Sequence, residues 1–225
     1  MLNKYIYFKK IISLTLCLCL IFTLYSTAYA ADYIEQSNQI IINGYTYKIV
    51  VDDDTKRQVK APDGTIATYF KENNVIEIFA EDSTITIDLN DDFIKQQETI
   101  ELQSNIFWEN QGIYNWKYRY IKYVDQRWQL RIAYGLGFQS YMTNENTNNR
   151  PYLFEFKNCV DTIKSCEQNI AAAGFGALLS LFGGPLIAAL TAAGASGVII
   201  ANANQLNNAI DDANTIFWYL HNNHL

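Results

Sequence analysis

Two kinds of hydrophobic pattern divide this chain. Between residues 39 and 89, apolar and polar positions alternate with a period of two in the runs 39–51, 65–71, 75–80 and 83–89. Turn-forming triplets such as Pro62-Asp63-Gly64 separate these runs. Short alternating runs with frequent turns are typical of an antiparallel meander, because each strand can pair with the next through a tight turn. This part of the chain is therefore predicted to form an antiparallel sheet.

An aromatic block between residues 106 and 142 continues the period of two. Trp128 and Leu130 alternate with Arg127 and Arg131. This alternation predicts two or three strands with one solvent-exposed, basic face. Tyr and Trp rings suit sheet packing as well as recognition of a membrane interface, a sugar or a protein, so both interpretations stay open. The residues that a recognition surface would use are Trp116, Tyr118, Tyr120, Trp128, Arg119 and Arg127.

The last third of the chain is helical in pattern and contains the run 168–210, which has no Asp, Glu, Lys or Arg. Gly183-Gly184-Pro185 interrupts the run, since glycines allow a positive φ and proline suits the first turn of a new helix. We therefore predict two apolar helices, 168–183 and 185–203, folded back on each other as a hairpin. The residues at its hinge or in its rows of small side chains are Ala172, Gly176, Ser180, Gly183, Gly184, Pro185, Ala189, Ala193 and Gly197.

The sequence is compatible with more than one environment for the apolar surface of this hairpin. Rows of small residues let helix backbones approach closely, as they do in pairs of membrane helices. Arms of about 24 Å and about 28 Å are marginal against a hydrocarbon core of about 30 Å. Insertion would therefore need tilt, a thinned bilayer or an oligomer. The alternatives are a close-packed soluble core and a permanent anchor in the producer's own membrane.

The N-terminus has the pattern of a secretion signal. Lys4, Lys9 and Lys10 precede the apolar stretch 11–25, and Ala28-Tyr29-Ala30 matches a cleavage signal. We predict a signal peptide over 1–30 and an extracellular location. Removal of its three lysines moves the formal charge from −6 to −9. That balance argues against a nucleic-acid partner and against simple electrostatic attraction to anionic lipid.

Two cysteines, Cys159 and Cys166, remain after the signal is removed. In an oxidising exterior a nearby pair is expected to form a disulfide. The spacing sets a condition, because seven residues of straight α-helix separate two Cα atoms by about 10 Å. A disulfide needs them within about 7 Å. A bridge therefore requires Cys159 to precede the helix.

Catalytic signatures are missing from the pattern. The two histidines, His221 and His224, lie at the very end of the chain, so no Cys-His nucleophile is expected. No Gly-rich phosphate loop or metal-binding cysteine cluster occurs in the sequence. The prediction is a protein without enzymatic activity, cofactor or metal.

The stretches 47–78 and 171–199 carry a resemblance. The first reads YKIVVDDDTKRQVKAPDGTIATYFKENNVIEI and the second AAAGFGALLSLFGGPLIAALTAAGASGVI. With the secretion signal, they resemble the secreted large bacteriocins of Gram-positive bacteria, notably the geobacillin-like group. The resemblance implies killing of related bacteria, through their membranes. It transfers no role to any single residue.

Together these observations predict an α+β protein: a signal peptide over 1–30, a β-rich and aromatic-rich domain over 31–142, a linker over 143–157 and an apolar helical hairpin over 158–225. The predicted function is that of a secreted antibacterial protein whose hairpin inserts into target membranes. The alternative is an extracellular binding module for a cell-wall polymer or a partner protein such as a receptor, with the hairpin as its soluble core.

Overall fold

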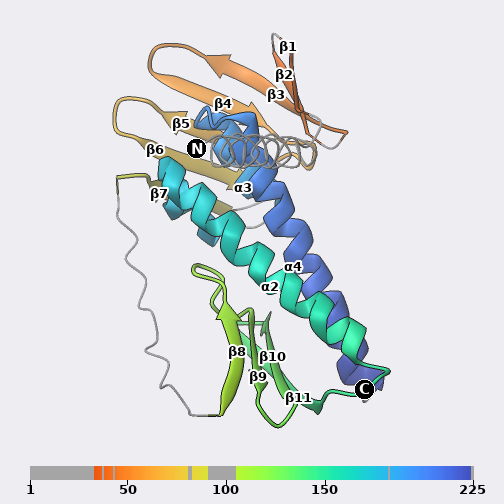
Figure 1. The fold of residues 1–225 in the computed structure, drawn as a ribbon. Coiled ribbons are helices and arrows are strands. Elements are labelled where there is room, and N and C mark those ends of the chain that lie inside the picture. The colour runs from red at the N-terminus through yellow and green to blue at the C-terminus, as the bar shows by residue number, and fades with distance from the viewer. Residues whose placement is uncertain are drawn as a thin grey trace, which may run out of the picture.

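The computed structural model describes residues 33–36, 38–42, 44–80, 83–90, 105–181 and 183–223. The predicted signal peptide and His224 lie outside these residues. The fold is α+β, as predicted: two antiparallel sheets are followed by helices. Figure 1 shows the two sheets at opposite ends of a long pair of helices.

The first sheet is a seven-stranded meander whose strands lie in chain order and pair antiparallel with their neighbours. Its alternating runs form strands because each run has one apolar face to bury. That face contributes Ile40, Val59, Ile76 and Ile78 to the core. The strands are β1 (Tyr33–Gln36), β2 (Gln39–Ile42), β3 (Tyr45–Asp52), β4 (Lys56–Lys60), β5 (Ile66–Phe70), β6 (Val75–Ala80) and β7 (Ser83–Asp88).

The second sheet has four strands in the order β11-β10-β9-β8, also antiparallel. Its buried face carries Tyr120, Trp128, Leu130 and Ile132. These side chains meet the helices, as the contact of the Trp128 ring with the ring of Phe154, at 5.6 Å between centroids, illustrates. The strands are β8 (Ile106–Gln111), β9 (Arg119–Tyr123), β10 (Arg127–Tyr134) and β11 (Gly137–Asn144).

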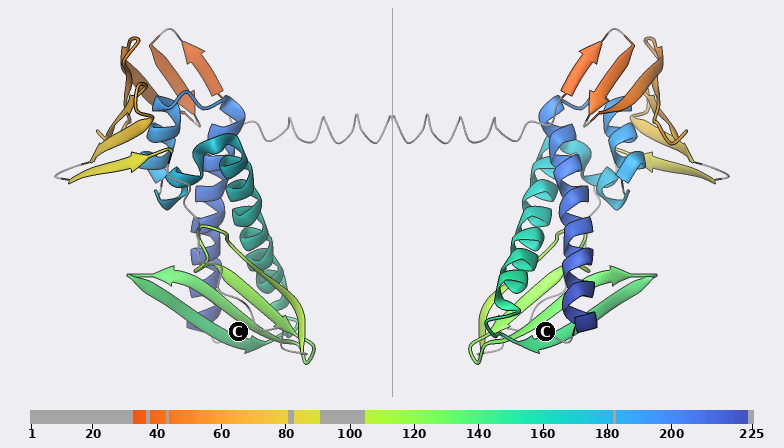
Figure 2. Two further views of the ribbon diagram at one scale, coloured as in Figure 1. Left: turned by 90° about the vertical axis from the view of Figure 1, so that its left-hand side faces the viewer. Right: turned by 90° about the vertical axis from the view of Figure 1, so that its right-hand side faces the viewer.

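Two long helices, α2 (Arg150–Ile170) and α4 (Gly197–Asn223), pack antiparallel along much of their length. Both views of Figure 2 show them side by side, with a sheet at either end. Between them the chain forms a π-helical turn η1 (Ala171–Phe175), a 3₁₀ turn η2 (Gly176–Ser180) and the short helix α3 (Gly183–Ala192). One hydrophobic core runs through both sheets and all the helices.

Helix α3 covers the inner face of β4, β5 and β6. Every residue from Leu186 to Ala192 is buried, as expected for a helix that is apolar all round. The Asp63 carboxylate from the β4–β5 turn approaches its first turn, where a Cβ on Gly184 would lie 2.8 Å from Oδ2. A carboxylate at that end is favourable, because the helix dipole is positive there.

The predicted hairpin of two apolar helices over 168–183 and 185–203 is wrong. The first arm stops being regular at Gly174, whose φ is 88°, and the second breaks at Gly194, whose φ is 75°. Such backbone angles end a right-handed helix, and glycine adopts them at little cost. The antiparallel pair is instead α2 with α4, and α3 is part of the connection between them.

The small residues of the predicted hairpin are accordingly spread over several elements. They do not form two continuous rows. Ala172 lies in η1, Gly176 and Ser180 in η2, Gly183, Gly184, Pro185 and Ala189 in α3, Ala193 in the loop after α3, and Gly197 at the start of α4. Within the described ranges, no helix has both the length and the apolar character to cross a bilayer.

Two further predictions need correction. Cys159 and Cys166 both lie inside α2 and both are free thiols, so they form no disulfide with each other. The geometric condition set by their spacing is not met, because the helix begins nine residues before Cys159. The predicted linker over 143–157 is also too long. Strand β11 reaches Asn144 and α2 begins at Arg150, which leaves only 145–149 as a connection.

Candidate functional site

The outer face of the four-stranded sheet carries stacked cations and rings. Arg131 lies opposite Arg119 and Ser140 in the sheet register, so it points away from the face that carries Leu130 and Ile132. Its guanidinium carbon lies 5.2 Å from the ring centroid of Trp116 and 4.9 Å from that of Phe138. Its Nη2 donates to the Trp116 carbonyl over 2.8 Å. The cation thus locks the two rings in place.

The β10–β11 turn beyond these rings ends in exposed apolar side chains. Leu136 is fully exposed, Tyr134 is 61 % exposed and Phe138 is 49 % exposed. Lys117 Nζ donates to the Leu136 carbonyl over 3.0 Å. On the other face of the turn, Tyr134 packs edge-on against Trp218 of α4 at 5.6 Å. We call Trp116, Lys117, Tyr134, Leu136 and Phe138 the tip patch.

The loop that carries Trp116 and Lys117 is held by one buried carboxylate, Glu167 of α2. Its Oε2 accepts the N–H groups of Ile113 (2.5 Å) and Tyr114 (3.0 Å). Its Oε1 accepts the N–H of Asn115 (2.6 Å) and the Asn115 side-chain amide (2.7 Å). Burial raises the pKa of Glu167, although these four hydrogen bonds oppose the rise. Through this carboxylate the helix positions the loop that leads into Trp116 and Lys117 of the tip patch.

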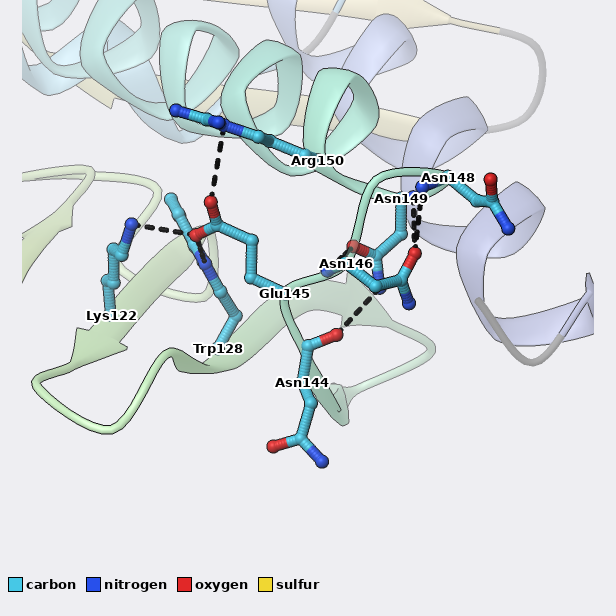
Figure 3. Close-up of polar contacts among 8 residues, drawn as sticks. All are labelled: Lys122, Trp128, Asn144, Glu145, Asn146, Asn148, Asn149 and Arg150. Carbon is cyan, nitrogen blue, oxygen red and sulfur yellow. Dashed lines mark hydrogen bonds and ion pairs between the residues drawn. The ribbon is translucent and has the colours of Figure 1, made fainter.

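A second polar cluster joins the sheet to the start of α2. Figure 3 shows Glu145 between Lys122 and Trp128 on one side and Arg150 on the other. Glu145 Oε2 accepts from Lys122 Nζ (2.7 Å) and Trp128 Nε1 (2.9 Å), and Arg150 Nε lies 3.3 Å from Oε1. Lys122 Nζ also lies 5.0 Å from the ring centroid of Trp108. These polar groups satisfy one another, so we assign the cluster a structural role.

The same connection is fixed by asparagine side chains. Asn149 is buried, and its Nδ2 donates to the Asn144 carbonyl over 2.8 Å. Its Oδ1 accepts the N–H of Asn146 over 2.8 Å, and Asn146 Oδ1 in turn accepts the N–H of Asn148 (2.8 Å). Such side-chain bonds to backbone groups stabilise turns. The Asn-rich stretch therefore ends β11 and leads directly into α2.

The six predicted recognition residues separate into two groups. Tyr118, Tyr120 and Trp128 are buried in the core, so the prediction that they belong to a recognition surface is wrong. Tyr120 and Trp128 point inward because the face of β9 and β10 that carries them meets the helices, and the Tyr118 hydroxyl donates to Asn214 of α4 over 3.2 Å. Trp116, Arg119 and Arg127 are not buried.

The charges of the two arginines are paired. Arg119 forms an ion pair with Glu109, and Arg127 pairs with Asp125 at 2.7 Å. Arg127 also stacks on the ring of Tyr123 at 5.1 Å. Trp116 is therefore the one member of the predicted set that belongs to the tip patch.

Leu136 and Phe138 are not among the recognition residues predicted from the sequence. The signal was present: residues 134–138 read YGLGF, and apolar side chains beside turn glycines depart from the polar composition of ordinary turns. Within the described residues, no three metal-ligating side chains are grouped to hold an ion. Comparison of the chain with protein-family models, curated proteins and solved structures finds no significant match. The resemblance to secreted large bacteriocins stays a prediction.

Proposed function

We propose that this is an exported, non-enzymatic protein that docks on an anionic membrane surface through its tip patch. The observation that carries the proposal is the exposure of Leu136 between two partly exposed aromatic residues. A fully exposed leucine at a β-turn gives nothing to the fold, whereas burial in a lipid interface is favourable by about 1.5–3 kcal/mol. The neighbouring Tyr and Trp rings suit the headgroup level of a bilayer.

The cations beside the tip patch favour an anionic surface. Lys117 borders the exposed residues, and the guanidinium of Arg131, a residue only 8 % exposed, lies behind Phe138, although the predicted exported chain has a formal charge of −9. A basic residue near an anionic leaflet contributes about 1 kcal/mol. With the apolar side chains, the gross attraction is roughly 4–6 kcal/mol, which corresponds to weak, reversible binding.

Peripheral docking agrees better with the described packing than insertion of the apolar run. To insert, α3 would have to leave the seven-stranded sheet and expose Ile40, Val59, Ile76 and Ile78 to water. Each buried side chain of this kind is worth about 1.5–3 kcal/mol, so the cost is roughly 6–12 kcal/mol. That is comparable to the whole stability of a typical domain. In this proposal the uncharged run 168–210 forms part of the hydrophobic core. An antibacterial role would begin with docking of the protein on the surface of the target cell.

The test is sedimentation of the protein with phosphatidylcholine vesicles, with and without phosphatidylglycerol. Leu136→Ser is expected to weaken binding to the anionic vesicles by about 10- to 100-fold. Val124→Ser is the matched control: Val124 is 65 % exposed but lies at the β9–β10 turn, outside the tip patch. It should bind as the unsubstituted protein does. Added salt should weaken binding, because exposed charges are screened.

Three outcomes would count against the proposal. One is absence of binding to anionic vesicles at low salt, and another is equal binding by Leu136→Ser and Val124→Ser. The third is release of an enclosed dye that Leu136→Ser leaves unchanged, which would favour insertion of the apolar run. Retention on purified cell wall without vesicle binding would instead favour the cell-wall binding module.

A further inference from the structure

A cavity of about 230 Å³ lies where the α3–α4 loop meets the seven-stranded sheet. It is lined by Ile40 of β2, Arg57 of β4, Thr191 of α3 and residues 194–197 of the loop. Most ligand pockets for drug-sized molecules are larger, from about 300 to 1,000 Å³. The volume therefore suits a small ion with a few waters.

Arg57 brings a cation to this cavity. Its Nε is buried and donates no hydrogen bond to any residue in the described ranges. A Cβ on Gly194 would lie 3.7 Å from Nη1, so the guanidinium reaches the loop. The opposing charge is Asp52, whose Oδ2 lies 3.8 Å from Nε and whose Oδ1 accepts from Lys71 Nζ at 2.9 Å. The guanidinium is thus incompletely paired at the cavity wall.

Thr191 provides an independent observation. It is 1 % exposed, and its Oγ1 has no hydrogen-bond partner among the described residues. Leaving a buried hydroxyl without a partner costs about 1–3 kcal/mol. Because the residue lines the same cavity as Arg57, a ligand there can accept a hydrogen bond from both side chains.

The start of α4 adds backbone donors to the same wall. Ser196 and Gly197 line the cavity, and α4 is 27 residues long. The N–H groups of Ile199 and Ile200 already donate to the Ser196 carbonyl, at 3.0 Å and 3.1 Å, so the donors that this helix end can offer a ligand are the N–H groups of Gly197 and Val198. The N–H groups of the first residues of a helix have no helical acceptor, and the helix dipole makes that end positive. Oxyanions bind readily at such ends.

We infer that this cavity binds a small oxyanion, a phosphate group, through Arg57, Thr191 and the N-terminus of α4. All three components are donors, and a phosphate supplies the acceptors that they lack. The phosphate can be free or part of a small phosphomonoester headgroup. The site lies at the opposite end of α4 from Trp218, which contacts the tip patch, so this inference does not depend on membrane docking.

Calorimetric titration of the full chain with inorganic phosphate, in chloride of matched ionic strength, tests this site. We expect saturable binding that Arg57→Gln weakens at least tenfold and Thr191→Val about fivefold. Thr191→Ser keeps the hydroxyl and should retain binding. Arg127→Gln, which removes the same charge from the four-stranded sheet, should bind phosphate as the unsubstituted protein does.

Stability measurements keep the test valid if a variant folds poorly. Thr191→Val removes an unpartnered hydroxyl at constant shape, so its urea midpoint without phosphate should equal or exceed that of the unsubstituted chain. Phosphate should raise the midpoint of the unsubstituted chain, and at the same concentration it should raise that of Thr191→Val less. Titration with glycerol phosphate distinguishes a headgroup from the free ion by its relative affinity. Absence of phosphate binding, or equal binding by Arg57→Gln and Arg127→Gln, would overturn the inference.

Discussion

The substitution Glu167→Gln tests how the tip patch is held. Glu167 is fully buried and accepts four hydrogen bonds from residues 113–115. This loop must turn tightly, since a Cβ on Gly112 would lie 2.6 Å from the Asn115 carbonyl oxygen. Glutamine has nearly the same shape as glutamate, but it replaces one acceptor oxygen by an NH₂ donor.

The expected loss follows from counting acceptors. The glutamine oxygen can keep two of the four donors, and the other two then face an amide NH₂. Each buried donor left without an acceptor costs about 1–3 kcal/mol, so the gross loss is about 2–6 kcal/mol. A neutral amide is easier to bury than a carboxylate, which offsets part of this loss. We therefore expect the free energy of unfolding to fall by about 2–3 kcal/mol.

Equilibrium unfolding in urea measures this loss. For a slope of about 1–3 kcal/mol per molar urea, the midpoint should fall by roughly 0.7–3 M. Glu155→Gln is the control, because Glu155 is exposed on the same helix, and it should change stability by less than about 0.5 kcal/mol. Equal stability of the two variants would refute the idea that the Glu167 carboxylate holds the loop.

Two further predictions concern titratable groups. Burial raises the pKa of Glu145, but hydrogen bonds from Lys122 and Trp128 and the nearby cations outweigh it, so the pKa lies below its ordinary value of 4.5. The stability that Glu145 contributes is therefore present above about pH 4.5 and lost as the pH falls through the lowered pKa, and the stability difference from Glu145→Gln should shrink there in acid denaturation. Burial raises the pKa of the Cys159 and Cys166 thiols to about 11, so a thiol reagent at about pH 8 should label them only after unfolding, and rapid labelling of the native protein would contradict their burial.

The strands could be predicted because their information is local. Residues 75–80 and 83–88 form paired strands β6 and β7 as the alternation indicates, and the Pro62-Asp63-Gly64 turn lies between β4 and β5. Alternation shows which side chains share a face, but it does not show which face meets a helix. For that reason the aromatic residues of β9 and β10 could be placed on a sheet and still be assigned to the wrong surface.

The helix breaks could not be predicted from the same kind of pattern. Gly174 and Gly176 look alike in sequence, yet Gly174 has a φ of 88° while Gly176 has helical angles. Gly176 is required for another reason: a Cβ there would lie 2.7 Å from the Tyr114 hydroxyl. Which glycine ends a helix and which allows a close contact depends on partners more than sixty residues away. The phosphate cavity likewise unites β4 with the start of α4, a contact that periodicity does not contain.

The uncharged run owes its composition to its position between two layers. A helix that is apolar on every side needs apolar surroundings, which a bilayer or a protein interior can supply equally well. Here the inner face of β4, β5 and β6 covers α3 on one side and α4 packs on another. The sheet face and α3 stabilise each other, because each would expose its apolar side chains to water if the other were absent. Among the described residues, the turn around Leu136 carries the most exposed large apolar side chain, and contact with a membrane is best sought there.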